Sequence, residues 1–501
     1  MPEIPFGYPI PEYSSYGTSV SLPKWQDNIN YEEGVPSVIA AMKSGYPRFF
    51  IALNIRKLTE IIKADLKTNS QILIFPSLKC AIRCKKFVLD QCTKDADIHV
   101  REYLIKAPKN DGAAVGAAFE SKLACPTMLY LAVYDAKLDK AARRYWQHTG
   151  DGISSRQAEY CLQLIEVSKQ AESGRSGAEH VAVGSSGVGG GTVSSGSVKT
   201  PSYYKRPAVL ANRGGASAQA GGLPASSASA TGDELEETES LRFIEERYGR
   251  NLNSRLAEES KLILKKRISG IIVESGSDNA SGRDQTEQYV SRGVLNLTES
   301  DVFLTPTGMS SIFHTHRTIL DFLKFEKSIC FGFPYTDTLK ILSSFGPGSH
   351  FFGLGEGTDY DDLEALLSSG NEHIAALFTE TPSNPLLKTP DLQRLRKLAD
   401  KYKFALVVDD SIGNFVNLDT LNLADVVVSS LTKLFSGDSN VMGGRLLVYF
   451  ANYVLSFLIR TDSTTSSLKA GLCIISKTCC GGKTLYFWKE TPERFWKELF
   501  R

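Results

Sequence analysis

Lys433 closes a short apolar run, and two hydroxyl side chains, Ser430 and Thr432, come just before it. The run from Val426 to Ser429 is rich in β-branched residues, which predicts a strand ending close to the lysine. A buried lysine has a lowered pKa, and its neutral amine can form a Schiff base with a carbonyl group. A lysine at a strand end can equally reach solvent, so this motif alone leaves both interpretations open.

A carboxylate ends a second apolar run, Val407-Val408-Asp409-Asp410. A carboxylate beside a buried strand needs a cationic partner or a hydrogen bond. Asp409 is suited to meet a protonated pyridine nitrogen, whereas the simpler interpretation is a cap on the following turn.

Thr307-Gly308-Met309-Ser310 follows a third apolar run and opens a helical pattern. The first amides of a helix have no intrahelical partner and, with nearby hydroxyls, can hold a phosphate. The alternative is an ordinary glycine turn between a strand and a helix.

The elements that must position these motifs alternate regularly beyond Asp301. Short β-branched runs are followed by helical stretches such as Pro390 to Tyr402, which predicts βαβ units and an α/β fold with a largely parallel sheet covered by helices. In such sheets the ligand lies at the carboxyl ends of the strands. The predicted strands cover residues 328–333, 375–379, 404–408 and 426–429.

The composition divides the chain into segments. Residues 1–170 mix apolar runs with charged helical stretches and predict a small α/β domain, whereas residues 171–236 are rich in Gly, Ser and Ala and predict a disordered linker. Residues 237–452 then form the large domain, which opens with a long charged helical pattern.

Charge and apolar content exclude several classes of function. The 57 basic and 56 acidic residues give a net charge of +1, so we expect no nucleic-acid partner. No apolar stretch approaches the ~20 residues of a membrane span. The nine cysteines show no disulfide framework and no leader is evident, so we expect a cytoplasmic protein. Cys80 and Cys84 have no second ligand pair, and His314 and His316 are two apart on a predicted helix and point in different directions, so we expect no metal site.

Taken in order, the motifs resemble the pyridoxal 5′-phosphate (PLP) dependent enzymes of cysteine and methionine metabolism, and especially the fungal cystathionine gamma-synthases. This resemblance implies PLP-dependent transferase fold type I. Three early segments are similar to the amino-terminal extension of the fungal members, for which we know no chemical role. The motifs are Gly308, Tyr335, Ser383-Asn384-Pro385, Asp409 and Lys433, and the early segments are 21–25, 31–34 and Gly45-Tyr46-Pro47-Arg48-Phe49-Phe50.

The resemblance assigns four side chains to the cofactor ring. Lys433 would hold PLP covalently and then move protons along the substrate. Asp409 would pair with the pyridinium nitrogen. Tyr335 resembles the tyrosine that stacks on the ring, and Asn384 the asparagine near its phenolic oxygen.

The cofactor phosphate has a second set of expected partners. By resemblance these are Gly308, Met309, Ser430 and Thr432. Tyr248 and Arg250 are similar to an element that reaches the phosphate bound by the neighbouring subunit. The resemblance therefore implies a homodimer or homotetramer.

The implied reaction is γ-replacement on an O-acylhomoserine, with L-cysteine as the acceptor and cystathionine as the product. A cystathionine lyase or an O-acetylhomoserine sulfhydrylase shares the same cofactor residues and stays open. So does a catalytically silent paralogue that acts only as a partner subunit.

Two features depart from the family pattern. Thr336-Asp337 replaces a glycine pair after the stacking tyrosine, and Asp410-Ser411 replaces Asn-Thr after the cofactor aspartate. Beyond Asn452, residues 453–501 do not resemble the family's carboxy-terminal domain, which supplies the arginine for the substrate carboxylate. We expect a shifted reading frame or a retained intron near Phe457, which transcript sequencing tests.

Overall fold

The computed structural model describes residues 4–10, 16–92, 96–106, 126–179, 254–270, 290–291, 294–295, 297–322, 326–437 and 440–448. The chain divides into two units, Met1–Ser168 with Tyr248–Arg501 and Lys169–Arg247, and every contact below lies in the first. Helix α6 (Ser155–Glu179) extends past the expected boundary at residue 170. Tyr248, Arg250, the rest of the expected linker and the tail at 453–501 lie outside the described residues.

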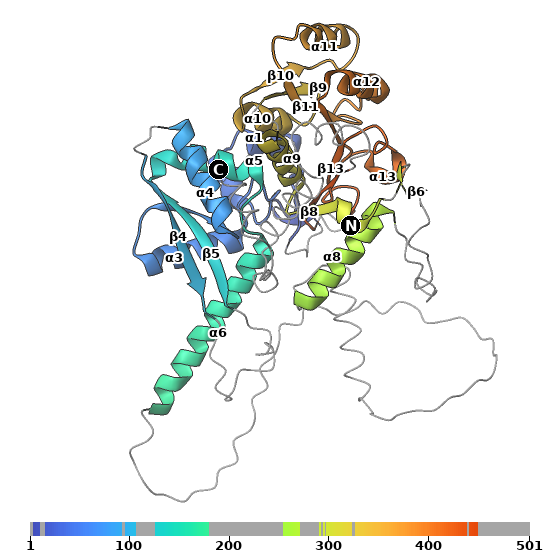
Figure 1. Cartoon of the computed structure of the whole chain (residues 1–501). Coiled ribbons are helices and arrows are strands. Elements are labelled where there is room, and N and C mark those ends of the chain that lie inside the picture. The colour runs from blue at the N-terminus through green and yellow to red at the C-terminus, as the bar shows by residue number, and fades with distance from the viewer. Residues whose placement is uncertain are drawn as a thin grey trace, which may run out of the picture. The chain divides into compact units, whose positions relative to one another are not determined.

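A seven-stranded sheet forms the centre of the large domain (Figure 1). Its strand order is β10-β9-β11-β12-β13-β14-β8, and the five strands from β10 to β13 pair in parallel, while β14 runs antiparallel to both neighbours. The predicted, mostly parallel sheet is therefore confirmed. The strands are β8 (Val302–Thr305), β9 (Lys327–Phe331), β10 (Ser349–Phe352), β11 (Ile374–Glu380), β12 (Ala405–Asp409), β13 (Val426–Ser430) and β14 (Gly444–Val448).

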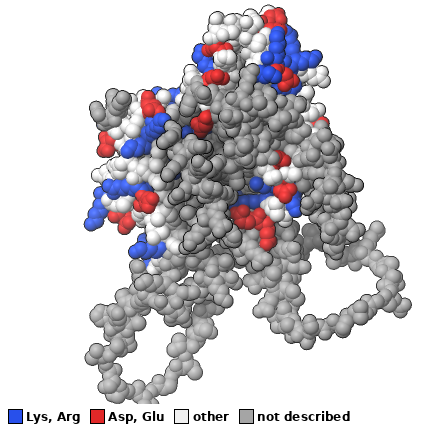
Figure 2. Space-filling model, in the orientation of Figure 1, with Lys and Arg blue, Asp and Glu red and all other residues white. Residues whose placement is uncertain are grey.

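Helices cover both faces of this sheet because every strand except the edge strand β10 contributes buried side chains to two apolar clusters. One cluster joins the sheet to α9 and α10, and the other joins it to α8, α11 and α12. Over α11 and α12, near the top of Figure 2, basic and acidic side chains lie side by side. The helices are α8 (Ser254–Ser269), α9 (Gly308–Phe322), α10 (Thr336–Ser344), α11 (Thr358–Ser368), α12 (Leu392–Tyr402) and the short α13 (Asn414–Asn417).

Local signals explain where α12 begins and ends. The Asp391 carboxylate accepts a hydrogen bond from the Arg394 amide, which satisfies one of the free donors at the start of the helix. Lys403 adopts a left-handed conformation after the last turn. None of the described helices is long and apolar enough to cross a membrane.

The leading domain is a second α/β layer structure. A three-stranded antiparallel sheet in the order β3-β5-β4 packs on α4 and α5 through one face and on α3 and α6 through the other. Its elements are α3 (Leu53–Leu66), β3 (Gln71–Phe75), α4 (Leu78–Gln91), β4 (Ile98–Ile105), β5 (Thr127–Tyr134) and α5 (Asp139–Thr149). Smaller elements are β1 (Pro9–Ile10), β2 (Ser19–Val20), α1 (Trp25–Glu32), α2 (Pro36–Ala41), β6 (Val290–Ser291) and β7 (Val294–Leu295).

A buried aspartate, Asp151, joins the leading domain to α9. Its carboxylate pairs with Arg83 at 2.8 Å, accepts a hydrogen bond from the Tyr145 hydroxyl at 2.6 Å, and lies 3.3 Å from Nε2 of His314. Burial alone raises the pKa of Asp151, but the charge of Arg83 and the bond with His314 outweigh it and hold that pKa below its usual range. The junction between the two sheets is therefore a buried charge cluster.

We expect Asp151→Asn to destabilise the protein by about 3–5 kcal/mol, because it leaves the Arg83 charge in the junction without its counter-ion. Urea unfolding of the full chain measures the change. Glu60→Gln is the control, since Glu60 pairs with Lys63 on the surface and its loss is expected to cost less than about 1 kcal/mol. Equal effects of the two substitutions would contradict the buried cluster.

Candidate active site

Three polar side chains line up where neighbouring strands of the large sheet end. Glu380 on β11 lies opposite Asp409 on β12. On β13 the residue opposite Asp409 is Val428, and Ser430 ends that strand two residues further along. The residues two positions before each of them are buried against α9. Because side chains two apart on a strand face the same side, all three project from the α9 face of the sheet.

The start of α9 meets this row at Ser430. A Cβ on Gly308 would lie 2.6 Å from the Ser430 Cβ and 2.9 Å from its Cα, so no side chain fits there. The Thr307 hydroxyl caps the helix by accepting from the Ser310 amide at 3.0 Å. Met309 is buried in the core beneath the first turn.

This arrangement fits a phosphate group. The Ser430 hydroxyl is buried and has no hydrogen-bond partner among the described residues. The first amides of α9, at Gly308 and Met309, lie next to it and have no intrahelical acceptor. An anion that binds here gains these donors and the favourable end of the helix dipole.

Lys433 lies in the turn that follows β13. Its side chain is exposed, and its Nζ lies 4.5 Å from the centre of the Tyr46 ring. The neighbouring Thr432 hydroxyl is buried and accepts a hydrogen bond from the Gly443 amide at 3.1 Å. Thr432 thus fixes the turn that presents Lys433.

Asp409 fits a cationic ring nitrogen. Its carboxylate accepts from the Ser411 amide at 2.9 Å, so it does cap the following turn. Within the described part of the chain it forms no ion pair, and burial raises its pKa to about 6. A cation beside it would restore the usual charged state of this carboxylate.

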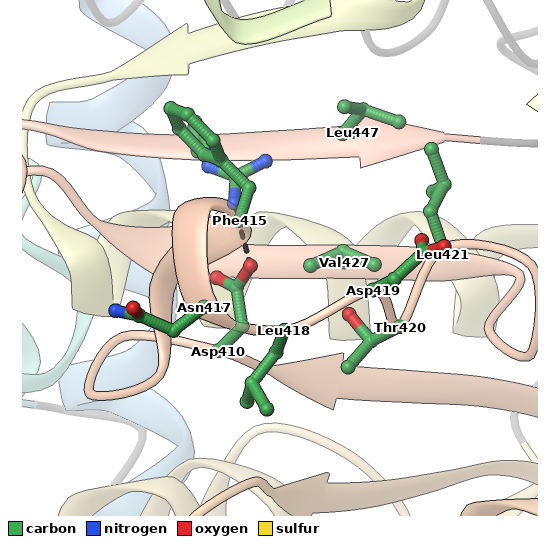
Figure 3. Close-up of a pocket in the computed structure, with 10 residues that line it drawn as sticks. Asp410, Phe415, Asn417, Leu418, Asp419, Thr420, Leu421, Val427 and Leu447 are labelled. Atoms are coloured by element: carbon green, nitrogen blue, oxygen red, sulfur yellow. Dashed lines mark hydrogen bonds and ion pairs between the residues drawn. The ribbon is translucent and has the colours of Figure 1, made fainter. Parts of the chain in front are cut away.

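Asp410 faces the other side of the sheet. It forms a buried ion pair with Arg445 at 2.7 Å, drawn as a dashed line in Figure 3. The pocket in Figure 3 is therefore separate from the Asp409 row. Its lining residues are Asp410, Phe415, Asn417, Leu418, Asp419, Thr420, Leu421, Val427, Arg445 and Leu447.

Sequence reasoning missed Glu380. Its carboxylate accepts from the backbone amides of Tyr335 at 2.8 Å and Asn384 at 3.2 Å. Burial and the neighbouring Asp409 raise the pKa of Glu380 to about 8. A carboxylate directly after the predicted strand at 375–379 was the available signal, by the same reasoning that singled out Asp409.

The structure thus brings together most of the residues chosen from the sequence. Gly308 meets Ser430, and Glu380 ties Tyr335 and Asn384 to the position of Asp409. Within the described residues no group of three or more His, Cys, Asp or Glu side chains is arranged to hold a metal ion.

A mostly parallel sheet with a lysine, carboxylates and a helix start at its carboxyl edge defines an α/β enzyme with a ligand site at the strand ends. Residues 54–154 match the fungal trans-sulfuration enzyme N-terminal domain, and residues 283–485 match the Cys/Met metabolism PLP-dependent enzymes. The chain belongs to this PLP-dependent family, as its motifs predicted, and its cofactor is PLP. The match to the PLP-dependent enzymes runs to residue 485 and so continues beyond Asn452, after which no resemblance to the family was predicted from the sequence.

Similar proteins include two fungal enzymes. The cystathionine gamma-synthase of Neurospora crassa is 38% identical over 467 residues, covering 89% of this chain and 71% of that protein. The cystathionine gamma-synthase of Saccharomyces cerevisiae is 33% identical over 512 residues, covering 88% and 71%. The solved structure of metB from Corynebacterium glutamicum has a TM-score of 0.26 and 20% identity, covering 36% of this chain and 47% of that one. The chain thus spans about half the length of that structure.

The stability of the protein without added cofactor is expected to fall as the pH rises from about 5 to about 8. In this pH range folded Glu380 keeps its proton because its pKa is raised to about 8, whereas the unfolded chain releases it. The free energy of unfolding is therefore highest at the acid end of the range and decreases as the pH rises. Glu380→Gln is expected to flatten this decline, as measured by urea midpoints at a series of pH values. Glu258→Gln, at an exposed position, is the control, and a slope unchanged by Glu380→Gln would refute the assignment.

Proposed function

We propose that this protein catalyses PLP-dependent γ-replacement, in which the thiol of L-cysteine displaces the acyloxy group of an O-acylhomoserine to give cystathionine. The observation that carries this proposal is the row at the strand ends, where Asp409 has no ionic partner among the described residues and the Ser430 hydroxyl has no hydrogen-bond partner there. Membership of the family and the fungal relatives named for this reaction support it.

PLP, when bound, supplies the electron sink that makes carbanion chemistry possible at the substrate. Asp409 would hold the ring nitrogen in its protonated form. Lys433 would hold the cofactor and move protons between the substrate carbons. Tyr335 would stack on the ring, with Asn384 near its phenolic oxygen.

The phosphate would bind at the start of α9. The amides of Gly308 and Met309 and the hydroxyl of Ser430 are the donors that the geometry offers, and Thr432 would contribute through the turn that it fixes. The favourable helix dipole at the start of α9 would help to hold the phosphate, and Asp409 would then be available to pair with the ring nitrogen.

Purified protein is expected to show a near-visible absorbance band that borohydride shifts while leaving the cofactor covalently attached, because reduction turns a Schiff base with Lys433 into a stable secondary amine. Lys433→Ala is expected to abolish this attachment. Lys401→Ala, which removes an exposed lysine on α12, is expected to keep the band. A wild-type protein without the band would refute the proposal and favour a silent partner subunit.

The acceptor decides between members of the family, whose relatives include an alanine racemase of Aspergillus violaceofuscus at 30% identity. With acetyl or succinyl homoserine ester as substrate, we expect the protein to form cystathionine from cysteine faster than it forms homocysteine from sulfide. Mass spectrometry measures both products. Faster turnover of sulfide would indicate an O-acetylhomoserine sulfhydrylase instead, and lysis of cystathionine would indicate a cystathionine lyase.

We also propose a homodimer in which Tyr248 and Arg250 reach the phosphate of the neighbouring subunit. Mixing Arg250→Ala with Lys433→Ala is then expected to restore activity to about a quarter of the wild-type level, since half of the dimers are hybrid and each hybrid has one intact site. Unmixed variants are the controls. Absence of recovery, with subunit exchange shown by light scattering and tagged pull-down, would contradict shared sites.

A further inference from the structure

A segment of the leading domain, Gly45 to Phe50, contacts both Lys433 and Tyr335. The Tyr46 ring is 4.5 Å from the Lys433 Nζ, and Arg48 donates a hydrogen bond from Nη2 to the Tyr335 hydroxyl at 2.9 Å. Two of the residues assigned to the cofactor ring therefore contact a part of the chain with no assigned chemical role.

The guanidinium of Arg48 is held rigidly. Arg48 is only 3% exposed. Its Nη1 donates to the backbone oxygen of Gln147 at 2.9 Å, and its Nη2 also reaches Asp337 at 3.1 Å. Because these donors are occupied and the side chain is buried, Arg48 is unsuited to bind the substrate carboxylate.

Aromatic rings surround the same guanidinium. Its Cζ lies 5.1 Å from the centre of the Phe49 ring, 5.5 Å from that of Tyr335 and 5.9 Å from that of Tyr46. A cation at these distances is attracted to the ring faces. Arg48 thus holds Tyr335 through both its hydroxyl and its ring.

Asp337 supplies the counter-charge. It is buried, and besides Arg48 it contacts Lys340 at 2.8 Å and His148 at 3.6 Å. Burial alone raises the pKa of Asp337, but the bonds from His148 and Lys340 and the charge of Arg48 outweigh it and keep the pKa below its usual range. Asp337 stands where the family pattern has a glycine, so this chain has an anion that the pattern lacks.

We propose that Arg48 is a positioning residue for Tyr335, and that the leading domain thereby forms one wall of the cofactor site. The role of Tyr335 at the ring rests on the proposed function. When Arg48 donates to the Tyr335 oxygen, the hydroxyl proton must be directed away from Arg48, and both ring and proton acquire one orientation. The hydrogen bond from the Tyr335 backbone amide to the Glu380 carboxyl group fixes the backbone of the same residue.

The test is a double-mutant cycle of Arg48→Met and Tyr335→Phe in the full chain. All four proteins keep Asp337, because Lys340 remains 2.8 Å from its carboxylate as a cationic partner when Arg48 is replaced. The readouts are the dissociation constant for PLP and the circular dichroism of the bound cofactor. The control is Arg56→Met, which removes an arginine that stacks on Phe50 without contacting Tyr335.

We expect Arg48→Met to weaken PLP binding about tenfold and to reduce the dichroism, because a charge-assisted hydrogen bond is lost. The effect should shrink to about twofold when Tyr335→Phe has already removed the acceptor. Arg48→Lys should recover part of the affinity, and Arg56→Met should change neither readout.

An Arg48→Met effect of the same size with and without the Tyr335 hydroxyl would overturn the inference, since Arg48 would then act only by fastening the segment. So would unchanged binding and dichroism in a protein that shows the cofactor band. A wild-type protein without the cofactor band would overturn the proposed function and, with it, the role of Arg48. The presence or absence of the band therefore distinguishes failure of the proposed function from failure of this inference alone.

Discussion

The parallel pairing of β11 with β12 places two carboxylates, Glu380 and Asp409, side by side at the edge of the sheet. Burial and then the neighbouring Asp409 raise the pKa of Glu380, because adjacent carboxylates resist double ionisation. A cationic ring nitrogen beside Asp409 would relieve that repulsion. Glu380 also accepts from the amides of Tyr335 and Asn384, so the segments after β9 and β11 depend on the same carboxyl group.

Buried ion pairs also join the leading domain to the large domain. Asp151 binds Arg83 and His314 at one point of contact, and Arg48 binds Asp337 at another. Such pairs lose much of their solvation energy on burial, so they are maintained only where the geometry satisfies both partners. The second pair lies beside Tyr335, to whose hydroxyl Arg48 donates a hydrogen bond.

The sequence predicted the layered fold and most of the row because both depend on local patterns. β-branched runs locate the strands to within one or two residues, and polar residues directly after them locate the carboxyl edge. Gly308, Asp409 and Lys433 were found in this way. Glu380 had the same signal, but its significance depended on the register that sets it opposite Asp409.

The sequence by itself determined four strands of the large sheet and the family to which the chain belongs, since periodicity and the order of motifs along the chain encode these properties. The tertiary structure alone decided that Arg48 meets Tyr335, which lies almost 290 residues further along the chain. No local pattern records that contact. A buried guanidinium is stable only where hydrogen-bond acceptors and a counter-charge surround it, and here packing supplies these groups from a distant part of the chain.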